Sequence, residues 1–437
     1  MKPHRSIVGG DRRLARTGAG AVLAVLLTVL AACSSSGSSS AGGAAATSAG
    51  GGGAATSAPA AGSSAASGSP IVIGNLASDS GSFGDPLWGQ ITSVWQKWTN
   101  AHGGINGHPV KVITMDDDSN PAQALADTKQ LVQGDHVQAI VGSVSCCASS
   151  AISSYVTQAG IPVIGGSTAD LGTGPYFFPT AETLAAFTAG ILQVAKSSGA
   201  SKFGAINPIG AVQNLQQAQA AYTAAGNKLG LSTVYVTQVS PTAPDYSAPC
   251  LALISSGAEA AYIAVSPTVN QRVIQTCIQQ GYKGNFALLS DFLTYPATNG
   301  STAAKDFSGG KVYVQNYVWP WYDQKTQAQK DYFAAIAQYA PGMLTNVAYG
   351  PPVQEAWAGL QLFATAAKLG GIGPASTPAD VTKAMYLIQN NNVGGLTVPL
   401  TFNQADKAHL VNCFFVTHLQ GGQWVDALGG APQCVTP

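Results

Sequence analysis

The chain has 437 residues, enough for two domains that each bury a hydrophobic core, together with accessory segments. Its 20 basic and 20 acidic residues give a net charge of zero. Five of the basic residues and one of the acidic residues lie within positions 1–32. The rest of the chain therefore has 15 basic and 19 acidic residues, a net charge of −4. Because that remainder is slightly acidic and has no run of Lys or Arg, we do not expect it to bind nucleic acid.

The first 32 residues have the features of an export signal. Basic residues precede an apolar stretch over 19–30 that is too short to span a membrane, and small residues follow it. The ending Leu30-Ala31-Ala32-Cys33 resembles a lipobox, the signal of bacterial lipoproteins. This resemblance implies cleavage before Cys33 and a lipid on its sulfur; the alternative is an ordinary signal with a chance cysteine.

A low-complexity segment of Ser, Gly and Ala follows over 34–69. It has too little apolar surface to form a core, so we expect a flexible tether whose reach is on the order of 35 Å. No later segment approaches the length of a membrane span, and lipid on Cys33 is therefore the only membrane anchor that we expect.

From residue 71 onward, short apolar runs alternate with helical segments of about 12 residues, a pattern typical of a doubly wound parallel sheet. The acidic run Asp116-Asp117-Asp118 is interpreted as a helix cap, because the glycine and distal glutamate of an EF-hand are missing. We expect strands at 71–76, 109–115, 137–141 and 163–164, and helices at about 86–101, 121–133 and 147–159.

The same alternation then repeats, which predicts a second α/β lobe and a cleft between the two lobes. Its expected strands are 203–206, 233–237, 260–265 and 286–289, and its expected helices are 213–229, 246–255 and 269–281. Three further helices, at 327–339, 349–368 and 378–390, are expected to return to the first lobe. The tail is expected to form antiparallel strands at 398–402, 411–417 and 423–425.

The stretch 137–168 contains the candidate binding loop. Small hydroxyl and thiol residues follow its first strand, where the next helix begins, and ligands bind at this edge of an open α/β sheet because free N–H groups and the positive helix end converge there. The residues are Ser143, Ser145, Cys146, Cys147 and Ser149. Helix capping by Ser145 is the alternative reading. A catalytic cysteine is disfavoured, because the nearest His, His136, lies at the opposite end of the preceding strand.

Six cysteines remain beyond Cys33, an even number in an exported and oxidising setting. Sequence alone does not fix the pairing, but context favours some pairs. Cys250 and Cys277 lie in successive helices around one strand, and Cys413 and Cys434 lie near the ends of a terminal hairpin. Cys146 and Cys147 would then form a vicinal bridge.

The sequence offers no clear metal, cofactor or catalytic motif. His102 and His108 flank a glycine-rich turn but lack a third ligand at a usable spacing, so a surface loop is the preferred reading. Trp319, Trp321 and Tyr322 are interpreted as packing near a connection between lobes. No P-loop, GxSxG, Rossmann fingerprint or CxxC is present, so we expect a protein that is not an enzyme and needs no cofactor.

Several short motifs occur together in a fixed order. They are Phe83-Gly84, Gly103-Gly104-Ile105-Asn106-Gly107, the acidic cluster before Pro121, Val141-Gly142-Ser143, Gly160-Ile161-Pro162-Val163-Ile164 and Gly394-Gly395 with Leu400-Thr401-Phe402. With them the chain resembles, from Pro70 to its end, the type I extracellular solute-binding proteins of ABC importers, the leucine/isoleucine/valine-binding class.

The resemblance implies two lobes joined by three crossings, near Pro179, near Tyr317–Pro320 and near Val398. It divides the chain into a signal peptide, 1–32, a lipidated tether, 33–69, a first lobe, 70–179 plus 320–397, and a second lobe, 180–319 plus 398–437.

The resemblance also implies the ligand-binding residues. The family's carboxylate-binding serine falls on Cys146, a departure for which Ser145 and Ser149 can substitute. Ser167 and Thr168 lie nearest to the position at the end of the next strand. Further implied ligand residues are Phe83, where relatives often have tyrosine, Asp291, in the position that meets an ammonium group, and Ser266, in the place of a pocket tyrosine.

The resulting expectation is a monomeric lipoprotein, held on the extracellular face of a bacterial cytoplasmic membrane, that delivers a small polar solute to an ABC permease. An amino acid or related carboxylate is the preferred solute. A ligand sensor for a membrane signalling partner and, less favoured, an exported hydrolase are the alternatives.

Overall fold

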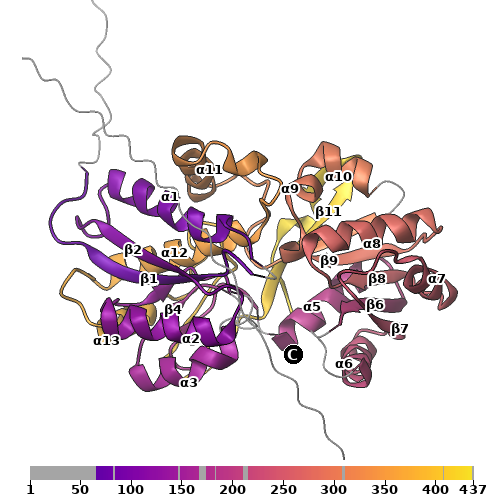
Figure 1. The fold of residues 1–437 in the computed structure, drawn as a ribbon, viewed down its shortest axis with the longest axis horizontal. Helices are drawn as coiled ribbons and strands as arrows, with labels where there is room; N and C mark the ends of the chain where they lie inside the picture. Colours follow the sequence, from indigo (N-terminus) through magenta and orange to yellow (C-terminus); the bar gives the residue numbers. More distant parts are fainter. Residues whose placement is uncertain are drawn as a thin grey trace, which may run out of the picture. The chain divides into compact units, whose positions relative to one another are not determined.

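The computed structural model describes residues 65–81, 84–145, 148–166, 174–182, 184–209, 215–307, 311–406 and 408–435. Two mainly parallel sheets flanked by helices organise this part of the chain (Figure 1). The predicted fold class, two doubly wound α/β lobes, is therefore confirmed. Within these ranges, no helix is long and apolar enough to cross a membrane.

The first sheet has the strand order β2-β1-β3-β4-β5, and all its neighbouring strands are parallel. The first strand is buried along nearly its whole length, because helices cover both faces of the sheet. The strands are β1 (Ile71–Ala77), β2 (Val110–Asp116), β3 (Ile140–Val141), β4 (Val163–Ile164) and β5 (Phe177–Phe178).

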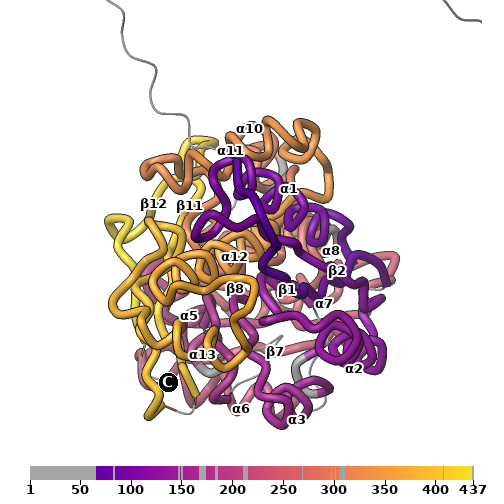
Figure 2. Tube along the Cα trace, turned by 90° about the vertical axis from the view of Figure 1, so that its left-hand side faces the viewer, coloured from indigo at the N-terminus to yellow at the C-terminus, as the bar shows by residue number. Residues whose placement is uncertain are grey.

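Helices from distant parts of the sequence share the core of this sheet. On one face lie α2 (Pro121–Lys129) and α3 (Ser149–Ala159), and on the other α1 (Leu87–Ala101), α11 (Gln327–Tyr339), α12 (Pro352–Leu369) and α13 (Pro378–Met385). Both α11 and α12 pack against α1 (Figure 2). Helix α12 also packs against β3 and β4. The predicted return of the late helices to the first sheet is confirmed.

The second sheet has the strand order β12-β11-β10-β9-β8-β6-β7. Its strands are β6 (Lys202–Pro208), β7 (Ser232–Val239), β8 (Ala260–Ile263), β9 (Asn285–Leu289), β10 (Lys311–Asn316), β11 (Cys413–Gln420) and β12 (Gln423–Asp426), with β13 (Gln433–Cys434) paired to β11. Its helices are α5 (Leu184–Ser197), α6 (Leu215–Lys228), α7 (Ser247–Ser255), α8 (Pro267–Gln279), α9 (Tyr295–Thr298) and α10 (Gly300–Asp306). Of the predicted antiparallel tail, the strands expected at 411–417 and 423–425 are present as β11 and β12.

The strands also differ from the prediction. The run 311–316 was not among the expected strands, but it forms β10, whose alternating apolar residues pair in parallel with β9. The run 398–402 forms no strand. Its apolar residues Val398, Leu400 and Phe402 instead pack in the core that contains α12 and α13, so this run belongs with the first sheet rather than with the second lobe.

The chain passes between the two cores at Pro320. Trp319 is buried in the first core, where its ring lies edge-on to Tyr332 with centroids 5.4 Å apart. Trp321 is buried in the second core, 5.0 Å from Trp424. The aromatic residues expected to form one cluster therefore anchor the connection from both sides.

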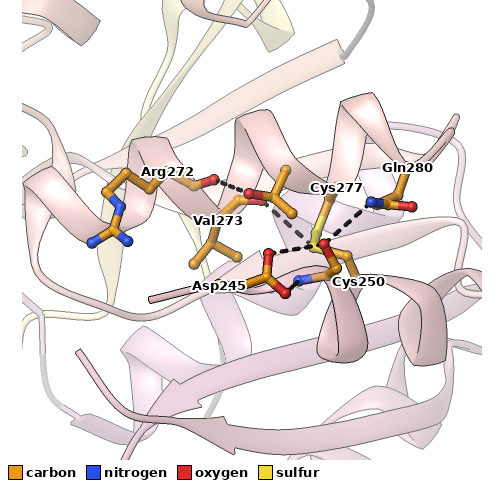
Figure 3. The surroundings of a disulfide bond; sticks show 8 residues. Asp245, Cys250, Arg272, Val273, Cys277 and Gln280 are labelled. Carbon is orange, nitrogen blue, oxygen red and sulfur yellow. Dashed lines mark hydrogen bonds between the residues drawn. A yellow bond between two sulfur atoms is a disulfide. The ribbon is translucent and has the colours of Figure 1, made fainter. Parts of the chain in front are cut away.

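Both disulfides that the sequence favoured are present. Cys250 in α7 bonds to Cys277 in α8, with Cα atoms 4.8 Å apart, and Cys413 in β11 bonds to Cys434 in β13, with Cα atoms 4.0 Å apart. Around the first disulfide, Figure 3 shows Asp245 and Gln280, which both hydrogen-bond to the hydroxyl of Ser247 and so tie the two helices together beside it.

Candidate functional site

Polar side chains gather at the carboxyl edge of the first sheet. Ser78 follows β1, Asp117 follows β2, and Ser143 and Ser145 follow β3. Parallel strands bring these loop residues to the same edge. Each of the four side chains is at most 1% exposed, so the edge is built on a buried polar layer.

The carboxylate of Asp117 is the centre of this layer. The Ser78 hydroxyl donates to its Oδ1 at 2.6 Å, and the Ser119 backbone N–H donates to the same oxygen at 3.0 Å. The Ser145 hydroxyl donates to Oδ2. One carboxylate therefore fastens together the loops that follow β1, β2 and β3.

This arrangement corrects two expectations about helix capping. The cap of α2 is Asn120, whose Oδ1 accepts from the N–H groups of Ala122 and Gln123, while Asp117 turns inward to the serines. The N-cap residue of α3 is Ala148, which makes no side-chain capping hydrogen bond. Ser145 is therefore bound to Asp117 rather than to the start of α3.

The two buried serines of the candidate loop hold its backbone in place. The Ser143 hydroxyl accepts from the N–H of Leu76 at 3.0 Å, which ties the β3 loop to β1. The Ser145 hydroxyl donates its proton to Asp117, so toward any further group it can only accept a hydrogen bond.

An acidic rim lies outside this layer. The carboxylate of Asp116 accepts the Ser80 hydroxyl and the N–H groups of Asp79, Ser80 and Asp118. Partial burial acts to raise the pKa of Asp116, but these hydrogen bonds outweigh it and lower the pKa below its ordinary value. Burial raises the pKa of Asp79 to about 6; the Gly89 N–H opposes this shift, and the neighbouring carboxylates add to it.

On the second lobe, two predicted site residues lie at the carboxyl ends of adjacent strands. Ser266 follows β8 and immediately precedes α8, which it does not cap through its side chain. Asp291 follows β9 in a short 3-10 turn, Ser290–Phe292. Both residues are half-buried, and the strand order brings them to one edge of the second sheet.

The segment after Asp291 contacts the first lobe. A Cβ on Gly350, just before α12, would lie 2.3 Å from the carbonyl oxygen of Leu293, so the two backbones touch. Tyr295 packs against the core of the first lobe. The loop that precedes α12 and the segment that carries Asp291 are therefore neighbours.

Several predicted ligand residues are not placed. Phe83, Cys146, Cys147, Ser167 and Thr168 lie outside the described residues, and so does the proposed Cys146–Cys147 bridge. Ser149 begins α3, and its side chain is also outside the description.

Sequence reasoning missed Ser78 and the inward-facing Asp117. The signal for both was available: each lies two positions after the end of a predicted parallel strand, as Ser143 does, and such positions meet at one edge.

Comparison with known proteins gives one family and several similar structures. A family model described as "Periplasmic binding protein" matches residues 70–423. An "Amino acid binding protein" of Pseudomonas aeruginosa is 37% identical over 99 residues, which are 22% of this chain and 26% of that protein. The matched stretch thus spans about a quarter of that relative.

Two similar solved structures contain aromatic acids. One is a solute-binding protein of an ABC transporter from R. palustris in complex with benzoate, with 15% identity, a TM-score of 0.63, and coverage of 84% of this chain and 98% of that one. The other, also from R. palustris, is in complex with 4-hydroxybenzoate, with 18% identity, a TM-score of 0.61, and coverage of 82% and 95%. At these identities the likeness concerns the fold.

Proposed function

The chain belongs to the periplasmic binding protein family, and from this premise we propose that it is the extracellular substrate-binding lipoprotein of an ABC importer. It captures a small polar solute between its lobes, and the solute stabilises a closed form that a membrane permease recognises. Since the family is one of solute-binding receptors, we assign no reaction to the chain.

The observation that carries the ligand class is the carboxyl edge of the first sheet, where a serine-rich loop leads into the 11-residue helix α3. Its N–H groups and helix dipole favour a carboxylate. Asp117 below this loop and Asp291 on the second lobe favour a solute that also carries an ammonium group, namely an amino acid. The amino acid-binding relative supports this choice, and the benzoate-bound structures support a carboxylate more generally.

We assign the solute contacts to the loop after β3, the end of β4 and the carboxyl edge of the second sheet. Ser145 accepts a hydrogen bond from the ammonium group of the solute through its lone pairs, and Ser143 acts by fixing the loop. The remaining proposed contacts are Phe83, Cys146, Cys147, Ser149, Ser167, Thr168, Ser266 and Asp291.

The proposal includes an anchor and lobe boundaries. Lipid on Cys33 holds a monomer at the extracellular face of the membrane through the tether 34–69. The first lobe comprises about 70–179 and 320–411, because the run 398–402 and Val411 pack in its core. The second lobe comprises about 180–319 and 412–437.

Calorimetric titration of the purified protein with amino acids, small amides and aromatic acids tests the ligand class. We expect a saturable heat with at least one carboxylate, and weaker binding of amino acids by Asp291→Asn because the ammonium group loses its partner. Asp331→Asn, at a partly exposed residue of α11, is the matched control. Binding of an uncharged solute but of no carboxylate contradicts the proposed ligand class.

A further inference from the structure

A row of aromatic side chains crosses the second lobe from its core to one edge. Between ring centroids, Phe203 lies 5.6 Å from Tyr222, and Tyr222 lies 6.5 Å from Tyr262. Tyr262 pairs with two further rings, those of Phe187 at 6.0 Å and Phe292 at 6.4 Å. Aromatic rings at such distances attract one another beyond the effect of apolar burial alone. The five rings therefore form one continuous row.

The row ends at the carboxyl edge of the second sheet. Helix α5 packs against β8, β9 and β10 and leads toward Lys202 at the amino end of β6, so its own start lies at the carboxyl edge. Phe187 is the fourth residue of α5, and helix geometry tilts its side chain toward that start. Phe292 belongs to the turn after β9 that also carries Asp291. Both outer rings are therefore at the edge to which we assign the solute.

The outer rings are accessible, whereas the inner rings are not. Phe203, Tyr222 and Tyr262 are at most 7% exposed, while Phe187 and Phe292 are only half-buried. Another apolar side chain at the same edge is open to solvent: Ile209, which follows β6, is 62% exposed. Apolar surface that gathers in one place on a folded protein commonly marks a binding site. This edge therefore offers accessible aromatic and aliphatic surface to a ligand.

The acid at this edge lies close to the aromatic row. Burial raises the pKa of Tyr262 well above its ordinary value, and electrostatic interactions with Tyr222 and Asp291 add to this shift. The carboxylate of Asp291 is thus within electrostatic range of the Tyr262 hydroxyl, and Phe292 is its neighbour in the chain. A solute whose charged group reaches Asp291 therefore has the rest of its body beside these rings.

We propose that Phe187 and Phe292 are specificity residues of the solute site and bind the aromatic ring of a carboxylate solute. This inference rests on the proposed function and narrows its ligand class to aromatic amino acids and aryl carboxylates. The serine-rich loop of the first lobe holds the carboxylate, while the second lobe extends its row of rings onto the solute. An aromatic ring is preferred to an aliphatic group of similar size, because its face and edge complement those of the phenylalanines.

The test uses two pairs of matched probes, phenylalanine with leucine and benzoate with cyclohexanecarboxylate, titrated by calorimetry. The members of a pair carry the same charged groups, and only one has an aromatic ring. We expect the wild-type protein to bind the aromatic member of at least one pair about threefold to tenfold more tightly. In Phe187→Leu and Phe292→Leu this preference falls below about twofold through weaker binding of the aromatic member. Phe333→Leu, at a half-buried residue of α11 in the first lobe, is the matched control and keeps the preference.

The outcomes separate this inference from the function on which it rests. If the wild-type protein binds carboxylates without preferring an aromatic member, or if both Leu variants retain the preference, the inference is wrong while the proposed function stands. If no carboxylate binds, the proposed function fails and this inference fails with it. Should a Leu variant fail to fold, Phe187→Met and Phe292→Met, which keep more of the buried volume, repeat the test with the same expected loss.

Discussion

Replacing Asp117 with Ala is expected to loosen the carboxyl edge of the first sheet. The substitution leaves three donors without their acceptor: the hydroxyls of Ser78 and Ser145 and the N–H of Ser119. A buried donor left unsatisfied costs about 1–3 kcal/mol, and the hydroxyls can rotate to recover part of this loss. We therefore expect the free energy of unfolding to fall by about 3–5 kcal/mol.

Urea unfolding at constant slope, followed by tryptophan fluorescence, measures this difference. Asp118→Asn is the control on the same loop, because Asp118 is exposed, accepts the Ser80 hydroxyl at 3.1 Å, and has a φ of 51° that Asn tolerates. We expect the control to change the free energy of unfolding by less than about 0.5 kcal/mol. A loss below about 1 kcal/mol for Asp117→Ala refutes the view that this carboxylate fastens the three loops.

Three further predictions concern a buried acid, a disulfide and the anchor. Burial raises the pKa of Glu182 from 4.5 to about 8, although a hydrogen bond from Gln315 opposes this shift. Between these two values the folded state keeps a proton that the unfolded state releases, so the free energy of unfolding falls as the pH rises from 4.5 to 8. Glu182→Gln should remove this loss of stability, which is about 3 kcal/mol by pH 7. The assignment is contradicted if the free energy of unfolding of the variant, measured in urea, falls between pH 5 and pH 8 as steeply as that of the wild-type protein. Replacing both Cys250 and Cys277 with Ser removes a disulfide that joins residues 27 positions apart, and it should lower the free energy of unfolding by about 3–4 kcal/mol. A change below about 1 kcal/mol contradicts this expectation. Cys33→Ser should release the protein from membranes and remove the lipid mass; an unchanged membrane fraction contradicts lipidation at this residue.

The alternation of strands and helices was predictable because it depends on local patterns. The buried run of β1, the capping Asn120 before Pro121 and Gly160 at the end of α3 each carry a short-range signal. The two disulfides also followed from their positions in successive helices and in a terminal hairpin. Strand β5 escaped prediction because two residues show no periodicity.

The site was less predictable because its contacts join distant parts of the chain. The inward turn of Asp117 depends on Ser78 and Ser145, which are separated from it by 39 and 28 positions. Helix α12 packs against Gly142 and Gly165 in the loops after β3 and β4, although its first residue, Pro352, follows them by 210 and 187 positions, and no local pattern encodes that approach. The run 398–402 has the alternation of a strand, but within the described residues it makes only an isolated antiparallel bridge, between Leu400 and Asn391, and no strand.

In the proposed function, the loop after β3 and the segment that carries Asp291 hold one carboxylate-bearing solute between the lobes. A crystal structure of the protein, grown with the tightest-binding compound of the calorimetric panel, tests it most directly. We expect density for that compound against residues 143–149 on one side and Asp291 on the other. Protein side chains filling that space, with the compound bound elsewhere or absent, would contradict it.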